Sequence, residues 1–74
     1  EGVLSVRQMP LADFVAELNR YRPGLLRCAP AVANLKVSGT YQLADTNQIL
    51  QLLARSLPVR IDYHTRYWVN IDAA

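Results

Sequence analysis

Hydrophobic and polar residues alternate in four stretches of the chain, and this period of two predicts β-strands. The first stretch, residues 3–8, is expected to direct Leu4 and Val6 to one face. Residues 35–41 alternate in the same way. Residues 59–64 and 67–72 alternate on either side of a tight turn, which predicts a closing hairpin. The hairpin residues expected to face inward are Val59, Ile61, Tyr63, Tyr67, Val69 and Ile71.

The segment after Pro10 changes to a spacing of three and four residues, which predicts a helix buried on one side. Proline suits the first turn of a helix, where its missing N–H is not needed. The helix is expected to run to about Tyr21, because Pro23-Gly24 then ends it. A short apolar strand at residues 25–28 and one helical turn at residues 31–34 are expected to follow. The inward residues of the helix are predicted to be Leu11, Phe14, Val15 and Leu18.

A second helix is predicted between Asp45 and Pro58. Asp45 is a suitable N-cap, and Gln48 three residues later resembles a capping box. The inward stripe is predicted to be Ile49, Leu52 and Leu53. Substitution of Leu52 by glutamate is therefore expected to unfold the domain.

The predicted elements follow the order β-α-β and then β-α-β-β. The two halves repeat in sequence, since Leu11-Ala12-Asp13 recurs as Leu43-Ala44-Asp45. Each half pairs a one-sided helix with strands that need its apolar face, so the two halves must share one core. With 74 residues the chain is expected to form a single domain, 1–74, of the α+β class, folded as a small αβ sandwich.

Apolar residues outside the predicted core suggest where a partner could bind. Leu50, Ala54 and Leu57 widen the apolar arc of the second helix beyond what one sheet needs. The arc indicates either a partner-binding face, on which Leu50→Glu or Leu57→Glu would weaken binding, or a helix sunk deeply in a small core. Trp68 alternates away from the core and is a second candidate, unless it packs under a loop. Open sheet edges are a third, because their backbone groups can accept another strand.

Residues that could support catalysis or metal binding do not converge in the sequence. His64 has only Asp62 nearby on its strand face, which is no metal site. Cys28 lacks a local nucleophile motif and is read as a small apolar filler. The seven arginines and single lysine are scattered, unlike the dense patch of a nucleic-acid-binding domain. We therefore expect no enzyme activity, no cofactor, no metal and no nucleic-acid partner, and no segment is long enough to span a membrane.

Three segments together resemble the C-terminal domain of FecR-type sigma-factor regulators. Residues 9–24 (MPLADFVAELNRYRPG) resemble its first helix, and residues 33–39 (ANLKVSG) its L-x-V-S-G strand. Residues 49–60 (ILQLLARSLPVR) resemble its second helix and the next strand. The resemblance implies the fold shared by secretins and the short N-terminal (STN) domains of TonB-dependent transducers. Transducer-side and secretin-type STN domains, which act in signalling and channel assembly, are the alternative, but they usually carry a Gly-Thr-Gly-like segment where this chain has ARSLP at residues 54–58.

The resemblance also implies a location and partners. FecR-type regulators sit in the inner membrane of Gram-negative bacteria, with a cytosolic segment that binds a sigma factor and a periplasmic C-terminal region. That region binds the periplasmic N-terminal signalling domain of an outer-membrane siderophore transducer. The family's leucine-rich contact stretch corresponds here to Leu50, Leu53 and Leu57. The chain, which begins without an initiator methionine, is thus expected to be a periplasmic piece of a longer membrane-anchored regulator.

Overall fold

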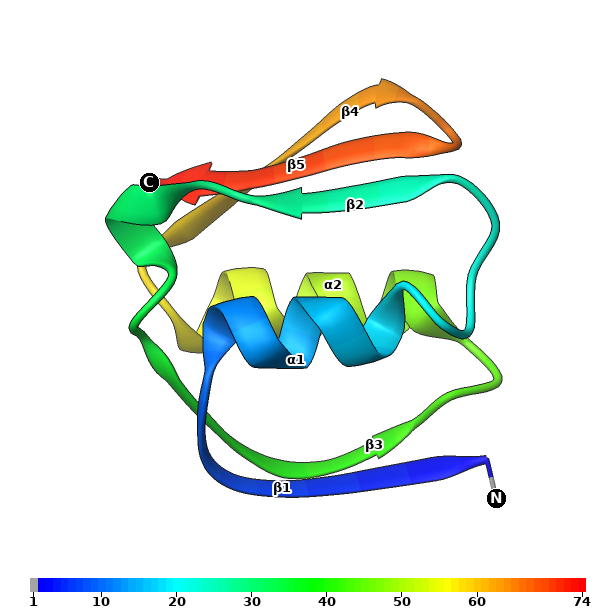
Figure 1. Cartoon of the computed structure of the whole chain (residues 1–74), viewed down its shortest axis with the longest axis vertical. Coiled ribbons are helices and arrows are strands. Elements are labelled where there is room, and N and C mark those ends of the chain that lie inside the picture. The colour runs from blue at the N-terminus through cyan, green and yellow to red at the C-terminus, as the bar shows by residue number, and fades with distance from the viewer. Residues whose placement is uncertain (1) are drawn as a thin grey trace.

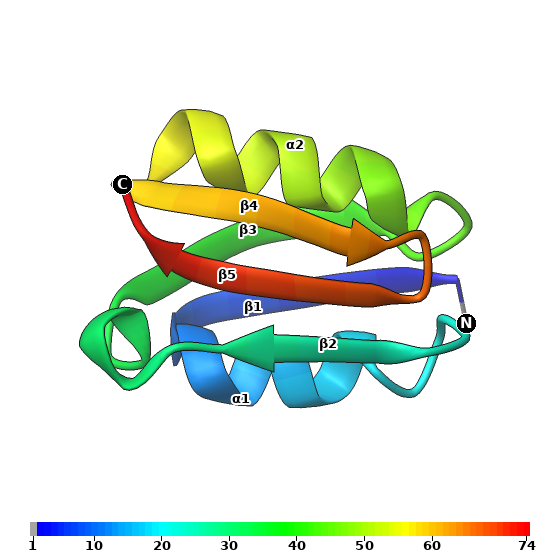
Figure 2. The same ribbon diagram turned by 90° about the horizontal axis from the view of Figure 1, so that it is seen from above.

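The chain folds into three layers, with two helices lying side by side between two β-sheets (Figure 1, Figure 2). The computed structural model describes residues 2–74. In chain order the elements are β1 (Val3–Pro10), α1 (Leu11–Leu18), β2 (Leu25–Cys28), the 3₁₀ turn η1 (Pro30–Val32), β3 (Lys36–Gln42), α2 (Thr46–Ser56), β4 (Val59–Thr65) and β5 (Trp68–Ala73). This order confirms the predicted β-α-β and β-α-β-β pattern and the small αβ sandwich.

The two halves contribute strands to both sheets. The first strands of the halves, β1 and β3, pair antiparallel in a two-stranded sheet. The remaining strands form a second sheet in the order β2-β5-β4, in which β2 is parallel and β4 antiparallel to β5. Each helix therefore has a sheet on two sides, as Figure 1 shows.

Helix α1 begins directly after Pro10 and has no side-chain cap. Its first backbone N–H groups are satisfied from the other half, because Leu11 N–H donates to Leu35 O at 2.7 Å and Ala12 N–H to Ala33 O at 3.1 Å. The helix ends at Leu18, so the predicted end near Tyr21 was wrong. The chain turns earlier because the Asn19 side chain holds the backbone of Leu26 at 2.8 Å.

Helix α2 begins as the sequence predicted. The Oδ1 atom of Asp45 accepts a hydrogen bond from Gln48 N–H at 3.1 Å, which confirms Asp45 as the N-cap. The helix ends at Ser56, two residues before Pro58. In the part of the chain that the structure describes, neither helix is long and apolar enough to cross a membrane.

A single apolar core fills the space between the two sheets. Phe14 lies at its centre and meets Tyr41 of β3 edge to face, with ring centroids 5.1 Å apart. The buried residues come from every regular element except β1 and include the predicted stripe of α1. They are Leu11, Phe14, Val15, Leu18, Leu26, Val32, Val37, Leu43, Ile49, Leu50, Leu53, Val59, Val69 and Ile71.

Two tyrosines of the hairpin depart from the predicted inward positions. Tyr67 is 52% exposed because it lies in the turn before β5 begins, where strand alternation does not apply. Tyr63 is 53% exposed because β4 is an edge strand with no neighbour beyond it. The inward prediction holds for Val69, Ile71 and Val59, while Ile61 is half-buried.

Candidate partner-binding surface

The buried face of α2 differs from the predicted one. Leu50 and Leu53 are 0% and 1% exposed, whereas Leu52 is 39% exposed. The inward stripe is thus Ile49, Leu50 and Leu53, so the expectations that Leu52 is core and that Leu50 is an outward binding residue were both wrong. The wide apolar arc arises because α2 packs against a sheet on each side, and one sheet alone would require a narrower stripe.

The other α2 candidates are not brought together as a leucine-rich surface. Ala54 is exposed and offers only a methyl group. Leu57 is half-buried and lines a cleft of about 220 Å³ between α2 and β3, together with Leu53 and Val37. The leucine-rich stretch of this chain therefore serves mainly as core.

Trp68 is exposed, as its alternation predicted. It lies on the outer face of the three-stranded sheet, and 47% of it is accessible. The parallel register places Leu25 of β2 beside it, and Leu25 is exposed to a similar extent. His64 of β4 stacks on its indole ring, with centroids 4.6 Å apart and the planes tilted by 37°. Three separate strands thus contribute to one exposed apolar and aromatic cluster.

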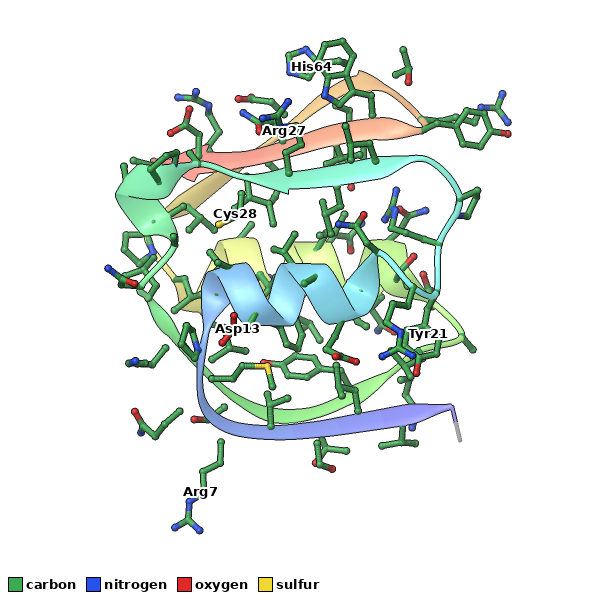
Figure 3. The ribbon with its side chains drawn as sticks, viewed as in Figure 1. Arg7, Asp13, Tyr21, Arg27, Cys28 and His64 are labelled. Atoms are coloured by element: carbon green, nitrogen blue, oxygen red, sulfur yellow. The ribbon has the colours of Figure 1, made fainter. Side chains whose placement is uncertain are left out.

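Basic and aromatic side chains extend this cluster. Figure 3 shows Arg27 and His64 on the outer side of the sheet, with Cys28 on its inner side. Tyr67 adjoins Leu25, whose N–H donates to Tyr67 O at 2.6 Å, and the Arg66 guanidinium lies 5.7 Å from the Tyr67 ring centroid. We define the Trp68 surface as the exposed residues Leu25, Arg27, His64, Tyr67 and Trp68. Tryptophan, tyrosine and arginine are the residue types that most often dominate binding energy at protein interfaces.

Gly24 holds the Tyr67 turn against the start of β2. Its φ is +90°, a conformation that side chains with a Cβ rarely adopt. A Cβ at this position would lie 2.0 Å from Tyr67 O, so the backbones approach as closely as only glycine allows. The position of the Tyr67 turn beside β2, and with it the Trp68 surface, therefore depends on Gly24, which is distant in the sequence.

A shallow hollow of about 320 Å³ lies beside Trp68. Its lining residues are Arg27, Cys28, Ala29, Pro30, His64, Trp68 and Asn70. Burial raises the pKa of the Cys28 thiol above its ordinary value, so the group is protonated at neutral pH. Residues 2–74 bring no three histidine, cysteine or acidic side chains close enough to hold a metal ion. The hollow therefore gives the Trp68 surface a concave region between Arg27, His64 and Trp68.

Asp62 makes no hydrogen bond to His64, its neighbour along the strand. Asp62 instead accepts from Arg60 Nε through both carboxylate oxygens, at 3.1 and 3.0 Å. Asp72 lies 3.9 Å from the same guanidinium, so Arg60 links β4 and β5 on the outer face. His64 is thereby left to stack on Trp68.

Asn19 and Leu25 were not predicted to have a role at the surface, and Tyr67 was expected to face the core. Leu25 joins Tyr67 and Trp68 only through the parallel pairing of β2 with β5, which links segments that are distant in the sequence. Asn19 is one polar residue at a helix end, and its bonds to Leu26 depend on the path of the following loop. The one feature of the sequence that pointed to any of these residues was the apolar Leu25 directly after Pro23-Gly24, which marks a strand that starts at a turn.

Two crystal structures of a putative anti-sigma factor from Parabacteroides distasonis have this fold. They match 99% of this chain with TM-scores of 0.81 and 0.82, at 16% and 15% sequence identity. The chain spans about a third (34%) of the length of each neighbour. No protein-family model and no curated protein sequence matches the chain. At this identity the likeness establishes the fold, while residue roles have to be argued from this chain itself.

Proposed function

We propose that this domain is the periplasmic docking module of a sigma-factor regulator of the FecR type. Its partner is the periplasmic N-terminal signalling domain of a TonB-dependent siderophore transducer in the outer membrane. Docking passes the iron-uptake signal across the inner membrane to a sigma factor held by the cytosolic part of the regulator. In this role the domain binds protein and needs neither a cofactor nor catalytic activity.

Two independent lines support this proposal. The sequence motifs at residues 9–24, 33–39 and 49–60 resemble FecR-type regulators. The fold matches the two crystal structures described as a putative anti-sigma factor over 99% of the chain. The fold match agrees with a sigma-regulator role, and the sequence motifs favour the regulator side over a secretin channel.

The observation that carries the docking role is the Trp68 surface. A sheet face that only meets water is expected to be polar, yet this one carries an indole stacked on a histidine and an exposed leucine, with the exposed Tyr67 in the adjoining turn. The opposite sheet shows the contrast, because Ser5 and Thr40 lie side by side on its outer face and share a hydrogen bond of 3.2 Å. We therefore place the transducer contact on the three-stranded sheet.

Calorimetric titration with the signalling domain of the transducer encoded beside the regulator tests this proposal. We expect saturable binding by the wild-type domain and a loss of at least tenfold in affinity for Trp68→Ala, in keeping with an interface hot spot. Tyr21→Ala is the matched control, because Tyr21 is an aromatic residue that is 48% exposed and lies away from the Trp68 surface (Figure 3).

The control should bind like wild type. Equal losses in both variants, or none in either, would contradict a docking role for the Trp68 surface. Absence of binding by the folded wild-type domain would contradict the proposed partner. Circular dichroism of each variant establishes that the fold is retained.

A further inference from the structure

The edge of β2 is already occupied by a side chain. Asn19 Nδ2 donates to Leu26 O and Asn19 Oδ1 accepts from Leu26 N–H, both at 2.8 Å. The amide thus makes the two hydrogen bonds that a neighbouring strand would make. Leu26 is one of the β2 residues whose backbone faces away from β5, because Leu25 donates to Tyr67 O just before β5 and Ala29 donates to Ile71 O of β5. A further strand therefore cannot add at β2 without displacing Asn19.

The opposite edge of the same sheet, β4, is open. The hydrogen bond from Ala74 N–H to Pro58 O shows which residues of the antiparallel ladder bond to each other. Counting in steps of two along the register, the next bonded pairs are Arg60 with Asp72 and Asp62 with Asn70. These even-numbered residues direct their backbone groups to β5, so those of Ile61 and Tyr63 face outward. Among residues 2–74, no other group hydrogen-bonds to the N–H or C=O of either residue.

The side chains beside this edge are also incompletely covered. Tyr63 alternates toward the helix layer but is 53% exposed, and Ile61 is only half-buried. Figure 2 shows α2 projecting past β4, so the position beside β4 has a helix beneath it and no strand above that helix. One more strand at this position would cover Tyr63 and lie on α2.

The other two edges are less suited to a new strand. On β3, Ser38 O accepts from the Tyr41 hydroxyl at 3.3 Å, and Gln42 O accepts from Asp45 N–H at 3.4 Å. On β1 the ladder is broken by a bulge between Val6 and Met9, where Gln8 has a φ of +54°. Bulges and side-chain caps are devices that protect edges from pairing.

We infer that β4 accepts an extended segment of the partner protein as a fourth strand of the β2-β5-β4 sheet. This inference rests on the proposed function, since it describes how the transducer's signalling domain engages the sheet that carries the Trp68 surface. The added strand extends that sheet, so one partner can pair with the β4 backbone and contact Trp68 at the same time. Its backbone supplies the hydrogen bonds, and an apolar side chain facing α2 packs beside Tyr63.

A second copy of this domain does not fit the same edge. An antiparallel pair of β4 strands would place two α2 helices beneath one junction, because each α2 projects past its own β4 (Figure 2). Adjacent strands are about 4.8 Å apart, whereas a helix with its side chains is about 10 Å wide. The occupant is therefore a strand that projects from its own domain.

The test compares Tyr63→Pro with Tyr63→Thr in the titration with the transducer signalling domain. Both variants lose the ring, but only proline removes the outward N–H, and an edge strand tolerates proline. We expect Tyr63→Pro to bind at least tenfold more weakly than Tyr63→Thr, because both variants lose the ring contact equally and only Tyr63→Thr keeps the outward N–H. Equal binding by the two variants would overturn the inference.

Amide hydrogen exchange of the wild-type complex tests the same edge without a variant that could misfold. We expect the amides of Ile61 and Tyr63 to exchange at least tenfold more slowly when the partner is bound, while the Leu26 amide is unchanged. Protection at Ser5 and Arg7 instead would assign the partner strand to β1 and overturn the inference. If Trp68→Ala abolishes binding but the β4 amides of the wild-type complex are not protected, the strand at the β4 edge is ruled out and the proposed function stands. If the wild-type domain does not bind the partner at all, both proposals are ruled out.

Discussion

Two leucines of α2 that are separated by one residue occupy opposite environments. Leu50 is fully buried between the sheets, and Leu52 is 39% exposed on the outer side of the helix. Successive residues on a helix are 100° apart, so a small error in the centre of the apolar stripe exchanges the two. The sequence pattern located the helix and its N-cap but could not decide between these leucines, because both choices give a continuous stripe.

The stability of leucine variants should follow this assignment. We expect Leu50→Ala to lower the free energy of unfolding by about 2–5 kcal/mol, because it leaves a cavity in the core. Leu52→Ala should lower it by less than about 1 kcal/mol. Urea denaturation followed by circular dichroism measures both values. A larger loss for Leu52→Ala than for Leu50→Ala would contradict the packing described here.

Gly24 offers a second prediction for a single residue. Gly24→Ala combines a φ of +90° with a Cβ placed 2.0 Å from Tyr67 O. We expect a loss of about 1–3 kcal/mol from the strained backbone, and more from the displaced turn. Gly2→Ala is the control, because Gly2 has a φ of +93° and nothing within 4 Å of the added Cβ. Thermal unfolding of both variants separates the close approach from the backbone strain, and equal losses would contradict a close approach at Gly24.

At the scale of elements, the order and type of strands and helices follow from local spacing, but strand partners do not. Alternation at residues 35–41 predicted a strand near β3, and the Asp45 N-cap predicted the start of α2. The pairing of β1 with β3, and of β2 with β5, joins distant segments and is determined by which faces remain to be buried. The wide apolar arc of α2 did indicate that this helix is buried on two sides, since a helix between two sheets needs apolar residues facing each of them.

The Asn19 cap of β2 gives a prediction at this scale. Asn19→Ala removes the acceptor for Leu26 N–H and the donor to Leu26 O, so we expect a loss of about 1–3 kcal/mol in the free energy of unfolding. Asn19→Asp keeps the acceptor for the Leu26 N–H, but it loses the donor and sets a second acceptor oxygen against Leu26 O, so its stability should also fall.

Exchange of the Leu26 amide proton, followed by NMR, provides the second readout. It should become faster in Asn19→Ala and stay slow in Asn19→Asp. Unchanged exchange in Asn19→Ala would mean that the amide does not cap this edge.

At the scale of the whole molecule, the two outer sheet faces differ. The β1–β3 sheet presents polar side chains such as Ser5 and Thr40 beside the exposed Val3, while the β2-β5-β4 sheet presents the Trp68 surface. Of the predicted binding residues, Trp68 was placed correctly because its alternation in a regular strand determined its side of the sheet. The residues around it were not predictable, because they come from strands that meet only in the folded molecule.

NMR mapping of the ¹⁵N-labelled domain shows whether the three-stranded sheet is the docking face. The chain has one tryptophan, so its indole N–H gives a single resonance that reports on this face. On addition of the transducer signalling domain we expect the largest shifts at the Trp68 indole and at the amides of β4 and β5. Shifts concentrated on the exposed side of α2, around Leu52 and Ala54, with an unchanged indole resonance, would mean that the partner binds the helix and not the three-stranded sheet.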